Sequence, residues 1–246
     1  MYVGLVTKTQ GVGQMEGKSV DEMVVYQARV SSPKSAEDKF KNISGLLRYC
    51  ALNSHWSIFD TVNLGFEIHT SRAIGRQLLR HSSIKPQEFS QRYESVTSFE
   101  EIELRGAHKS NRQSSSEGFD PIIKSVLASS LVENHLENTS ELYKVLVDSG
   151  VAREQARLVL PETATSKLYM NGSLRSWITF LNVRLHDTTQ KEARLIAEEI
   201  KKVLTEQAPI ISQAFFNYEA GNGIHFLERI VLEKFGVYQQ ALNDGK

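Results

Sequence analysis

The side chains best suited to chemistry are crowded into one stretch, RHSSIKPQEFSQRY, residues 80–93. Glu88, Ser90 and Arg92 alternate there as they would on an extended segment, so an acid, a hydroxyl and a guanidinium are predicted to point the same way. Arginine supplies a planar bidentate donor and serine a short hydroxyl donor, and with backbone amides they suit a phosphate group. This stretch is the first candidate for a phosphate-binding loop.

A predicted helix, 71–81, leads into this loop. Gln77, Arg80 and His81 share one of its faces, because residues three and four apart are neighbours on a helix. Cations near a helix C-terminus also interact favourably with the helix dipole. Arg80 and His81 therefore have a structural explanation as well as a functional one.

A second arginine pair lies in the predicted helix 153–160. Arg153 and Arg157 are four residues apart on one face, where two like charges destabilise a helix unless an acid or anion lies between them. Either Glu154 or a distant carboxylate neutralises the pair, or a ligand does. The sequence leaves both explanations open.

The segment LRSWITFLNVRLHD combines an apolar and a polar stripe on a predicted helix, 174–185. Arg184 belongs to neither stripe and falls beside Trp177 at the edge of the apolar face. A guanidinium there needs a partner, which is either a structural carboxylate or a base carbonyl or anion of a ligand. The apolar stripe contains Leu174, Trp177, Ile178, Leu181 and Leu185, and the polar stripe contains Arg175, Thr179, Asn182 and His186.

The composition of the chain limits the class of protein. Its 246 residues are long for one domain and short for two, and 29 basic residues balance 29 acidic ones. With no net charge, an anion site must come from local clustering, which argues against a general nucleic-acid coat protein. No apolar run approaches the ~18 residues of a membrane span, and MYVGLVTKTQ lacks the layout of a signal peptide. We therefore expect a cytosolic protein.

The single cysteine, Cys50, excludes an intrachain disulfide and a multi-cysteine zinc site. It lies in an apolar helical pattern, so we expect a buried packing residue with an ordinary thiol. His55 and His69 have no partners at metal-ligand spacing, and we predict no metal site.

Hydrophobic periodicity predicts both strands and helices. We expect an α/β (α+β) fold, a single domain over 1–246 with a mostly antiparallel sheet flanked by helices. The polar stretch 105–119 has too few apolar side chains to pack and is predicted to be a mobile loop or lid. Strands are predicted over 2–6 and 61–69, the second with Val62, Leu64, Phe66 and Ile68 on one side. Helices are predicted over 19–30, 35–53, 71–81, 121–150, 153–160, 174–185 and 189–204, with more near 210 and 226.

The run QLLRHSSIKPQEFSQRY, residues 77–93, resembles the signature of the flavin-dependent thymidylate synthases, the ThyX family. In that signature Arg-His-Arg is followed by seven residues and a serine, with a glutamate before the serine and Arg-Tyr after it. The resemblance covers about residues 28–208. Other segments that resemble the family, in its order, are HWSIFD (55–60), NRQSS (111–115), ARLVLP (156–161) and RSWITFLNVRLHDTTQKEAR (175–194).

The resemblance implies a nucleotide site shared between subunits, with the loop that ends at Arg92 reaching in from a neighbouring copy. Ser90 and Arg92 would lie near the phosphate. Arg184 would have the catalytic role, because it would polarise the pyrimidine and favour loss of its N3 proton. The residues implied to bind substrate are Gln77, Leu78, Leu79, Arg80, Glu88, Phe89, Ser90, Gln91, Arg92, Arg157 and Arg184.

The resemblance also implies an FAD site. Ser82 departs from the family pattern, because the third signature position is normally arginine, and Lys85 is a nearby replacement charge. The residues implied to touch FAD are Arg80, His81, Ser82, Glu88, Ser173, Leu174, Arg175 and Thr179.

The implied reaction is the reductive methylation of dUMP to dTMP by a homotetramer with shared active sites. Methylenetetrahydrofolate would donate the carbon, and NADPH would reduce the FAD. Flavin and folate would carry the chemically difficult steps, while the protein would supply binding, orientation and electrostatics.

Two alternatives stay open. Ser82 and Lys85 suggest a related enzyme that modifies C5 of another pyrimidine nucleotide, by methylating dCMP or by leaving a hydroxymethyl group. A non-catalytic nucleotide- or RNA-binding protein would use the arginines without a cofactor. Zero net charge and the absence of aromatic stacking runs speak against RNA.

Overall fold

The structure of this protein is a computed structural model, which describes residues 1–30, 39–93, 95, 98–116, 119–123 and 126–216. These residues fall into two compact units, and each unit is described by itself. Unit 1 contains residues 1–4, 66–170 and 187–196, and unit 2 contains residues 5–65, 171–186 and the described residues from 197 onward.

The main sheet has four strands in the order β1 (Tyr2–Lys8), β2 (Asn63–Ser71), β8 (Thr165–Ser173) and β3 (Lys85–Glu88). The end of each strand bonds to the start of its neighbour: Thr9 N donates to Asn63 O at 2.9 Å, Arg72 N to Ala164 O at 3.0 Å, and Phe89 N to Lys167 O at 2.8 Å. This pattern is antiparallel. The predicted α/β class with an antiparallel sheet is therefore confirmed.

Strand β2 confirms the alternation predicted for residues 61–69. Val62, Leu64, Phe66 and Ile68 are fully buried, and each buried side chain of this size contributes about 1.5–3 kcal/mol to folding. The predicted first strand, 2–6, is also present as part of β1.

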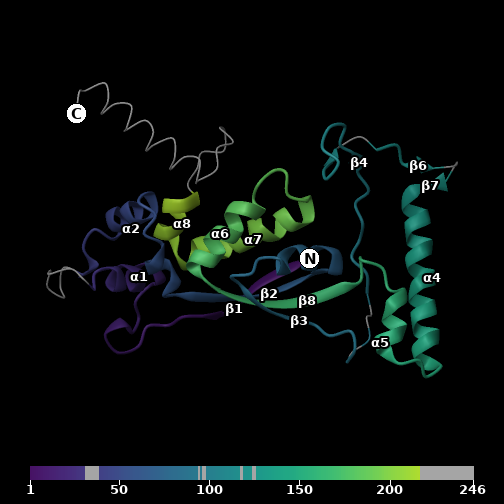
Figure 1. Cartoon of the computed structure of the whole chain (residues 1–246), viewed down its shortest axis with the longest axis horizontal. Helices are drawn as coiled ribbons and strands as arrows, with labels where there is room; N and C mark the ends of the chain where they lie inside the picture. Colours follow the sequence, from purple (N-terminus) through teal and green to yellow (C-terminus); the bar gives the residue numbers. More distant parts are fainter. Residues whose placement is uncertain (31–38, 94, 96–97, 117–118, 124–125, 217–246) are drawn as a thin grey trace. The chain divides into compact units, whose positions relative to one another are not determined.

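In unit 2, helices α1 (Val20–Ala28), α2 (Ile43–Leu52) and α8 (Pro209–Phe216) pack on one another, as Figure 1 shows. The Ser19 hydroxyl accepts from Glu22 N while the Glu22 carboxylate accepts from Ser19 N, a capping box that fixes the start of α1. Unit 2 also contains α6 (Leu174–Arg184), close to its predicted range.

The helix predicted over 35–53 was placed too early in the chain. Asn42 has a left-handed backbone, with φ of 49°, and its side chain accepts from Gly45 N at 3.2 Å, so this residue caps α2 and the helix begins at Ile43. The predicted residues 35–38 lie outside the described residues, as does the helix predicted near 226.

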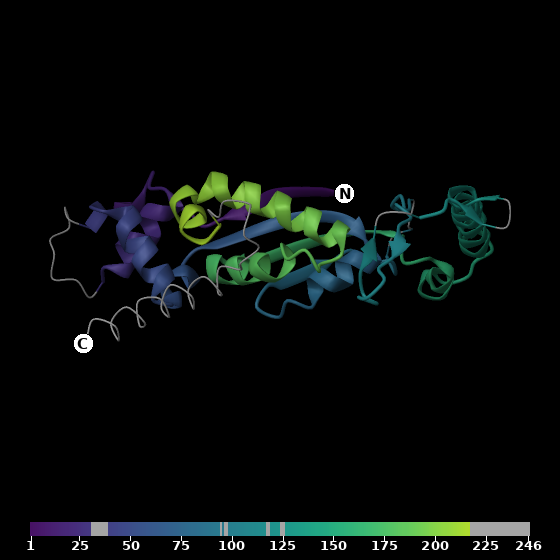
Figure 2. The same ribbon diagram turned by 90° about the horizontal axis from the view of Figure 1, so that it is seen from above.

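Unit 1 contains α3 (Arg72–Leu79), α4 (Ala128–Asp148), α5 (Arg153–Ala156) and the beginning of α7 (Lys191–Gln207). Helices α4 and α5 lie side by side, as Figure 2 shows from above. No helix in the described part of the chain is both long and apolar enough to cross a membrane.

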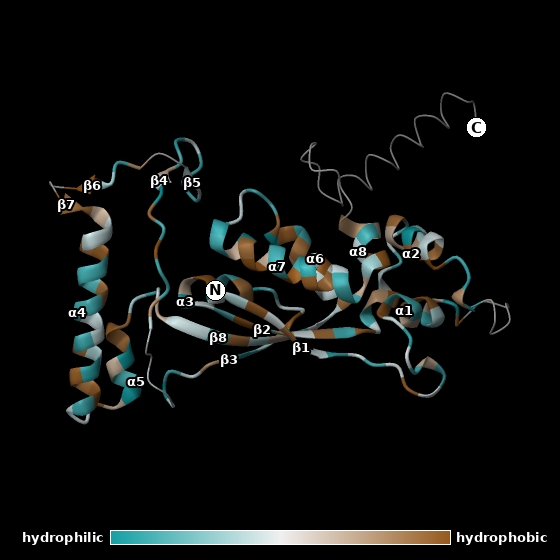
Figure 3. Cartoon of the chain, turned by 180° about the vertical axis from the view of Figure 1, so that it is seen from behind, coloured by the Kyte–Doolittle hydropathy of each residue, from teal (hydrophilic) through white to brown (hydrophobic). Residues whose placement is uncertain are grey.

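The prediction of one helix over 121–150 was wrong in its first turns. Strands β6 (Ile122–Ile123) and β7 (Val126–Leu127) pair in antiparallel register before α4 begins. The reason is local, because β-branched side chains favour strands and Ala128 N donates to Pro121 O at 2.7 Å across the hairpin. Figure 3 shows that both short strands are hydrophobic, although their side chains are exposed.

The polar stretch 105–119 contains a hairpin of β4 (Gly106–Ala107) and β5 (Ser115–Ser116). Its turn is closed by a bond from Ser114 N to Asn111 O at 3.1 Å. The mobility of this stretch stays a prediction, as does the single-domain organisation of the chain.

Candidate active site

The end of α3 carries the first predicted site residues. Leu78 is fully buried and serves the core, whereas Gln77 and Leu79 are half-buried and Arg80 is exposed. The predicted helix over 71–81 is wrong at its end, because His81 N donates to Leu78 O at 3.1 Å, three residues back, and α3 stops at Leu79. Arg80 and His81 therefore lie beyond the helix, at the entrance to the loop.

The loop that follows is extended only as far as Glu88, the last residue of β3. The Oγ of Ser166 donates to Oε1 of Glu88 at 3.0 Å. Beyond it, Tyr93 N donates to Ser90 O at 3.1 Å and closes a turn around Arg92. The predicted alternation of Glu88, Ser90 and Arg92 is therefore wrong, because a turn replaces the extended chain.

Arg92 borders a small hollow at the start of α5. Its Nη2 lies 3.1 Å from Oε2 of Glu154, and Arg153 Nη1 donates to Tyr93 O at 3.3 Å. Arg92 and Tyr93 line a hollow of about 310 Å³ with Ala152, Arg153 and Glu154. The carboxylate of Glu154 thus pairs with the arginine of the loop.

The predicted helix over 153–160 is divided in two. Helix α5 ends at Ala156, and a 3-10 helix, Arg157–Val159, follows it. Leu160 N donates to Arg157 O at 3.1 Å before Pro161, which cannot continue a helix, so the tighter turn ends the segment. Arg157 is half-buried at the junction.

Two other loop residues have distinct surroundings. Gln91 is buried, and its Nε2 has no hydrogen-bond partner among the described residues. A buried amide donor without a partner costs about 1–3 kcal/mol, so this nitrogen is a candidate contact for a ligand acceptor. Phe89 lines a separate pocket of about 640 Å³ with His69, Lys167 and other residues of unit 1.

Unit 2 holds the other predicted group, at the start of α6. The Ser173 hydroxyl accepts from Ser176 N at 3.2 Å and donates to Oδ1 of Asp60 at 2.8 Å. Arg175 Nη1 lies 3.0 Å from Oδ2 of the same aspartate. Asp60 therefore fixes Ser173 and Arg175 together.

Helix α6 is held in place by its buried face. Leu174 and Trp177 are fully buried, and Trp177 Nε1 donates to Leu64 O at 2.9 Å. On the exposed side, Thr179 Oγ1 donates to Arg175 O at 2.9 Å within the helix. Arg184 is the last residue of α6 and is half-buried, as expected for the edge of the apolar face.

The predicted residues thus fall into one group in each unit. Gln77 to Arg92 and Arg157 lie in unit 1, and Ser173 to Arg184 lie in unit 2. Their convergence into one site stays a prediction. Among the described residues, no group of three or more His, Cys, Asp or Glu side chains could hold a metal ion.

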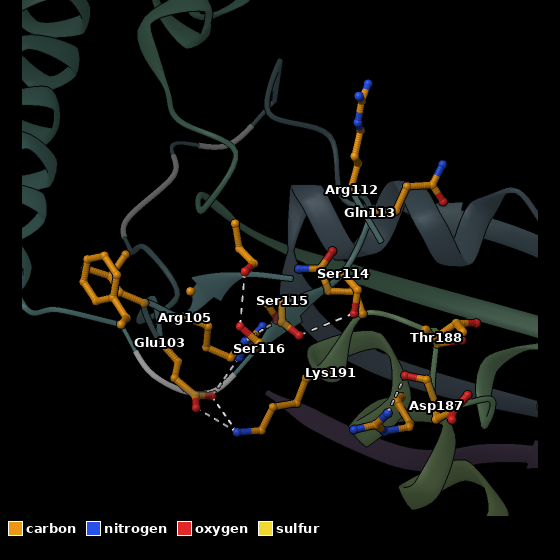
Figure 4. Close-up of a pocket in the computed structure, with 17 residues that line it drawn as sticks. Glu103, Arg105, Arg112, Gln113, Ser114, Ser115, Ser116, Asp187, Thr188 and Lys191 are labelled. Atoms are coloured by element: carbon orange, nitrogen blue, oxygen red, sulfur yellow. Dashed lines mark hydrogen bonds and ion pairs between the residues drawn. The ribbon is translucent and has the colours of Figure 1, made fainter. Parts of the chain in front are cut away.

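One large pocket of unit 1 was not predicted. This pocket, which we call the arginine-serine pocket, has a volume of about 790 Å³ and lies between the β4–β5 hairpin and the start of α7 (Figure 4). It is lined by Glu103, Leu104, Arg105, Gly106, Ala107, Arg112, Gln113, Ser114, Ser115, Ser116, Phe119, Asp187, Thr188, Thr189, Gln190, Lys191 and Arg194.

One side of the arginine-serine pocket is an ion-pair network. Arg105 lies 2.8 Å from Glu103 and 2.7 Å from Glu192, and Lys191 lies 2.7 Å from Glu103. Burial alone favours the neutral form of Arg105, but the two carboxylates outweigh burial and raise its pKa. Burial likewise raises the pKa of Glu192, but hydrogen bonds, including those from Arg105 and Gln190, lower it overall.

A sequence signal for this pocket existed. Arg105, Arg112 and the serines 114–116 are the same donor types that identify the loop at Arg92 as a phosphate site. The polar composition of residues 105–119 predicts a mobile loop. A mobile loop is not expected to hold donor side chains in fixed positions, so these arginine and serine residues were not predicted to form a pocket.

Comparisons with known proteins agree with one another. The family model described as thymidylate synthase complementing protein matches residues 14–210. A flavin-dependent thymidylate synthase from Synechocystis sp. is 39% identical over 209 residues, which cover 85% of this chain and 95% of that protein. A probable flavin-dependent thymidylate synthase from Paramecium bursaria Chlorella virus 1 is 36% identical over 221 residues, which cover 87% of this chain and 98% of that protein.

A solved structure is also similar. The UMP/dUMP methylase PolB from Streptomyces cacaoi, bound with 5-Br dUMP, has a TM-score of 0.72 and 27% sequence identity. The likeness covers 88% of this chain and 95% of that one.

Proposed function

This chain belongs to the family of flavin-dependent thymidylate synthases, and from this premise we propose that it catalyses the reductive methylation of dUMP. In the balanced reaction, dUMP, methylenetetrahydrofolate, NADPH and a proton give dTMP, tetrahydrofolate and NADP⁺. The observation that carries the proposal is the 39% identity to the Synechocystis enzyme over 85% of the chain.

The residues proposed for FAD fit that cofactor by their chemistry. Arg80 and Arg175 provide guanidinium groups for a diphosphate, and Ser173 and Thr179 provide hydroxyls for polar ring atoms. Bound flavin supplies the hydride that converts the transferred carbon to a methyl group. His81, Ser82, Glu88 and Leu174 complete the proposed set.

The residues proposed for dUMP divide into phosphate and base contacts. Arg92 and Ser90 bind the phosphate, since Arg92 stands at a hollow and, among the described residues, its guanidinium pairs only with the exposed carboxylate of Glu154. Arg157 is a further contact. Arg184 acts on the pyrimidine, where its charge stabilises the N3 anion and makes C5 more nucleophilic.

The remaining substrate contacts are supported less directly. The buried amide of Gln91 lacks a partner among the described residues, which suits contact with a ligand. The complete proposed set also includes Gln77, Leu78, Leu79, Arg80, Glu88 and Phe89.

Methylenetetrahydrofolate, NADPH and a homotetramer with shared sites are part of the proposal, as is a cytosolic location. Exposed apolar side chains on α4 and the β6–β7 hairpin support assembly between copies, because monomers rarely leave such patches uncovered. These exposed residues are Ile122, Ile123, Val126, Leu127, Leu131, Leu142 and Val145.

The test is anaerobic incubation of the purified protein with FAD, NADPH and methylenetetrahydrofolate, followed by the mass of the nucleotide product. Equal amounts of dUMP, UMP and dCMP compete in one reaction, and UMP is included because PolB is a UMP/dUMP methylase. We expect dTMP. Modified dCMP, a hydroxymethylated product or no product would contradict the proposal, and preferential methylation of UMP would reassign the substrate.

A further inference from the structure

We propose that the arginine-serine pocket binds the phosphate groups of the nicotinamide dinucleotide that reduces the flavin. This inference rests on the proposed function, since it assigns a place to one substrate of that reaction. None of the residues predicted to bind dUMP or FAD lines the pocket. The pocket is therefore available for a third ligand.

The pocket adjoins the predicted nucleotide site. Gln77 Nε2 donates to Oε1 of Gln190 at 2.7 Å, and Gln190 lines the pocket at the start of α7. A dinucleotide is long and flexible, so when its phosphates lie in the pocket, its far end comes within reach of the region around Gln77. Arg80, which is proposed to touch FAD, follows Gln77 three residues later, so this relation suits a hydride donor to the flavin.

The cations of the pocket differ in whether a carboxylate already pairs with them. Glu103 holds Lys191 through both carboxylate oxygens, at 2.8 and 2.7 Å, and it also pairs with Arg105. Arg112, in contrast, is exposed, and its guanidinium has no partner among the described residues. Figure 4 shows Arg112 extending away from the pair formed by Glu103 and Lys191. The guanidinium of Arg112 is thus available to bind an anion.

Hydroxyl groups also line the pocket. Ser114, Ser115 and Ser116 come two to four residues after Arg112, and Thr188 and Thr189 line the pocket from the other segment. Guanidinium and hydroxyl donors together suit the oxygens of a phosphate group. The nearby N-terminus of α7 adds a favourable potential for an anion.

The size and lining of the pocket favour a dinucleotide over folate. A volume of about 790 Å³ is within the usual range of a cofactor-sized site. Among the described lining residues, only Phe119 is aromatic, so the pocket offers little stacking surface for a pterin ring. The carboxylate tail of folate has a chemistry similar to phosphate, and the experiment separates the two.

The experiment uses FAD-loaded protein and compares Arg112→Gln with Lys109→Ala. Lys109 is an exposed cation in the same segment that does not line the pocket, so it is a matched control for loss of charge. Equilibrium dialysis measures NADP⁺ binding directly. Stopped-flow absorbance measures flavin reduction by NADPH. A second assay measures dTMP formation without NADPH: the enzyme is reduced with dithionite and then given dUMP and pentaglutamylated methylenetetrahydrofolate.

We expect Arg112→Gln to weaken NADP⁺ binding by about tenfold or more, because a charged hydrogen bond is lost. NADPH-driven reduction should need a correspondingly higher NADPH concentration, while Lys109→Ala stays normal. With dithionite, Arg112→Gln should form dTMP at the wild-type rate.

Unchanged NADP⁺ affinity in Arg112→Gln would overturn the proposal. Loss of polyglutamylated folate use with dithionite, while NADPH reduction stays normal, would also overturn it and would make the pocket a carboxylate site. The wild-type dithionite reaction reports on the proposed function alone: if it yields no dTMP, that function fails, whatever the dialysis shows.

Discussion

The guanidinium Nη2 of Arg92 lies 3.1 Å from the carboxylate Oε2 of Glu154, and the two side chains are 61% and 50% exposed. The pair connects the turn after β3 to the first turn of α5. Exposed ion pairs contribute only about 0–1 kcal/mol to stability. Its more important consequence is that Arg92 is held at the edge of a hollow and can exchange one carboxylate partner for a phosphate.

Replacement of Arg92 should therefore affect binding more than stability. We expect Arg92→Ala to weaken dUMP binding by about tenfold or more, because a hydrogen bond between charged groups is lost, with little change in melting temperature. Isothermal titration calorimetry and thermal denaturation measure the two quantities. Arg76→Ala is the matched control, because Arg76 forms a similarly exposed pair with Glu162 outside the proposed site. Equal dUMP affinity in the two variants would remove Arg92 from the site.

Arg184 should act on turnover. In Arg184→Lys the charge remains but the planar donor fork is lost, so we expect kcat to fall by about a hundredfold with a smaller change in dUMP affinity. If the guanidinium favours loss of the N3 proton, the lost activity should be partly recovered as the pH rises. Arg48→Lys, at an exposed position of unit 2, is the control. A fully active Arg184→Lys would refute the activation role.

Cys50 should be dispensable for catalysis. Its side chain is 4% exposed, and burial raises the pKa of its thiol, so little nucleophilic thiolate is present. We expect Cys50→Ala to keep its turnover and to lose about 1 kcal/mol of unfolding free energy from reduced apolar burial. Dithionitrobenzoate should label native Cys50 slowly and the unfolded chain rapidly. Loss of turnover in a folded Cys50→Ala variant would contradict this assignment.

The fold was predictable where one periodicity dominates. The alternation of Val62, Leu64, Phe66 and Ile68 identified β2, and the stripe on α6 identified its buried face. Element boundaries were less predictable, because single local bonds decided them. The side chain of Asn42 caps the first turn of α2. The pairing of β6 with β7 means that α4 begins only at Ala128.

The geometry of the candidate site was less predictable than its residue types, and the roles of these residues stay a prediction. The donor set of the loop is present, but the turn closed by Tyr93 and Ser90 redirects Arg92. When the alternating residues are all polar, no apolar face is buried to stabilise the extended chain, so a turn can form in its place. The arginine-serine pocket was not predicted, because two segments that are distant in sequence form it. One is the hairpin around residue 112 and the other is the start of α7, and local sequence patterns do not show that such segments meet.

The carboxylate of Asp21 should make the stability of the protein depend on pH. Asp21 is 2% exposed, and it accepts hydrogen bonds from Ile210 N at 3.0 Å and Ile211 N at 2.9 Å at the start of α8. Burial raises the pKa of Asp21 above its ordinary value of 3.8, although the two backbone bonds oppose that shift. A raised folded-state pKa gives a stabilisation that is complete below pH 3.8 and is lost as the pH rises through the folded value.

Asp21→Asn cannot ionise, so it should lack this dependence. Chemical denaturation at fixed protein concentration and a series of pH values should show the stability of wild type, relative to Asp21→Asn, decreasing as the pH rises above 3.8. Each unit of pKa shift corresponds to about 1.4 kcal/mol. Glu16→Gln, which replaces an exposed acid nearby in sequence, is the control for the removal of one carboxylate. If the stability of wild type relative to Asp21→Asn instead increases as the pH rises, the two backbone hydrogen bonds, and not burial, control the ionisation of Asp21.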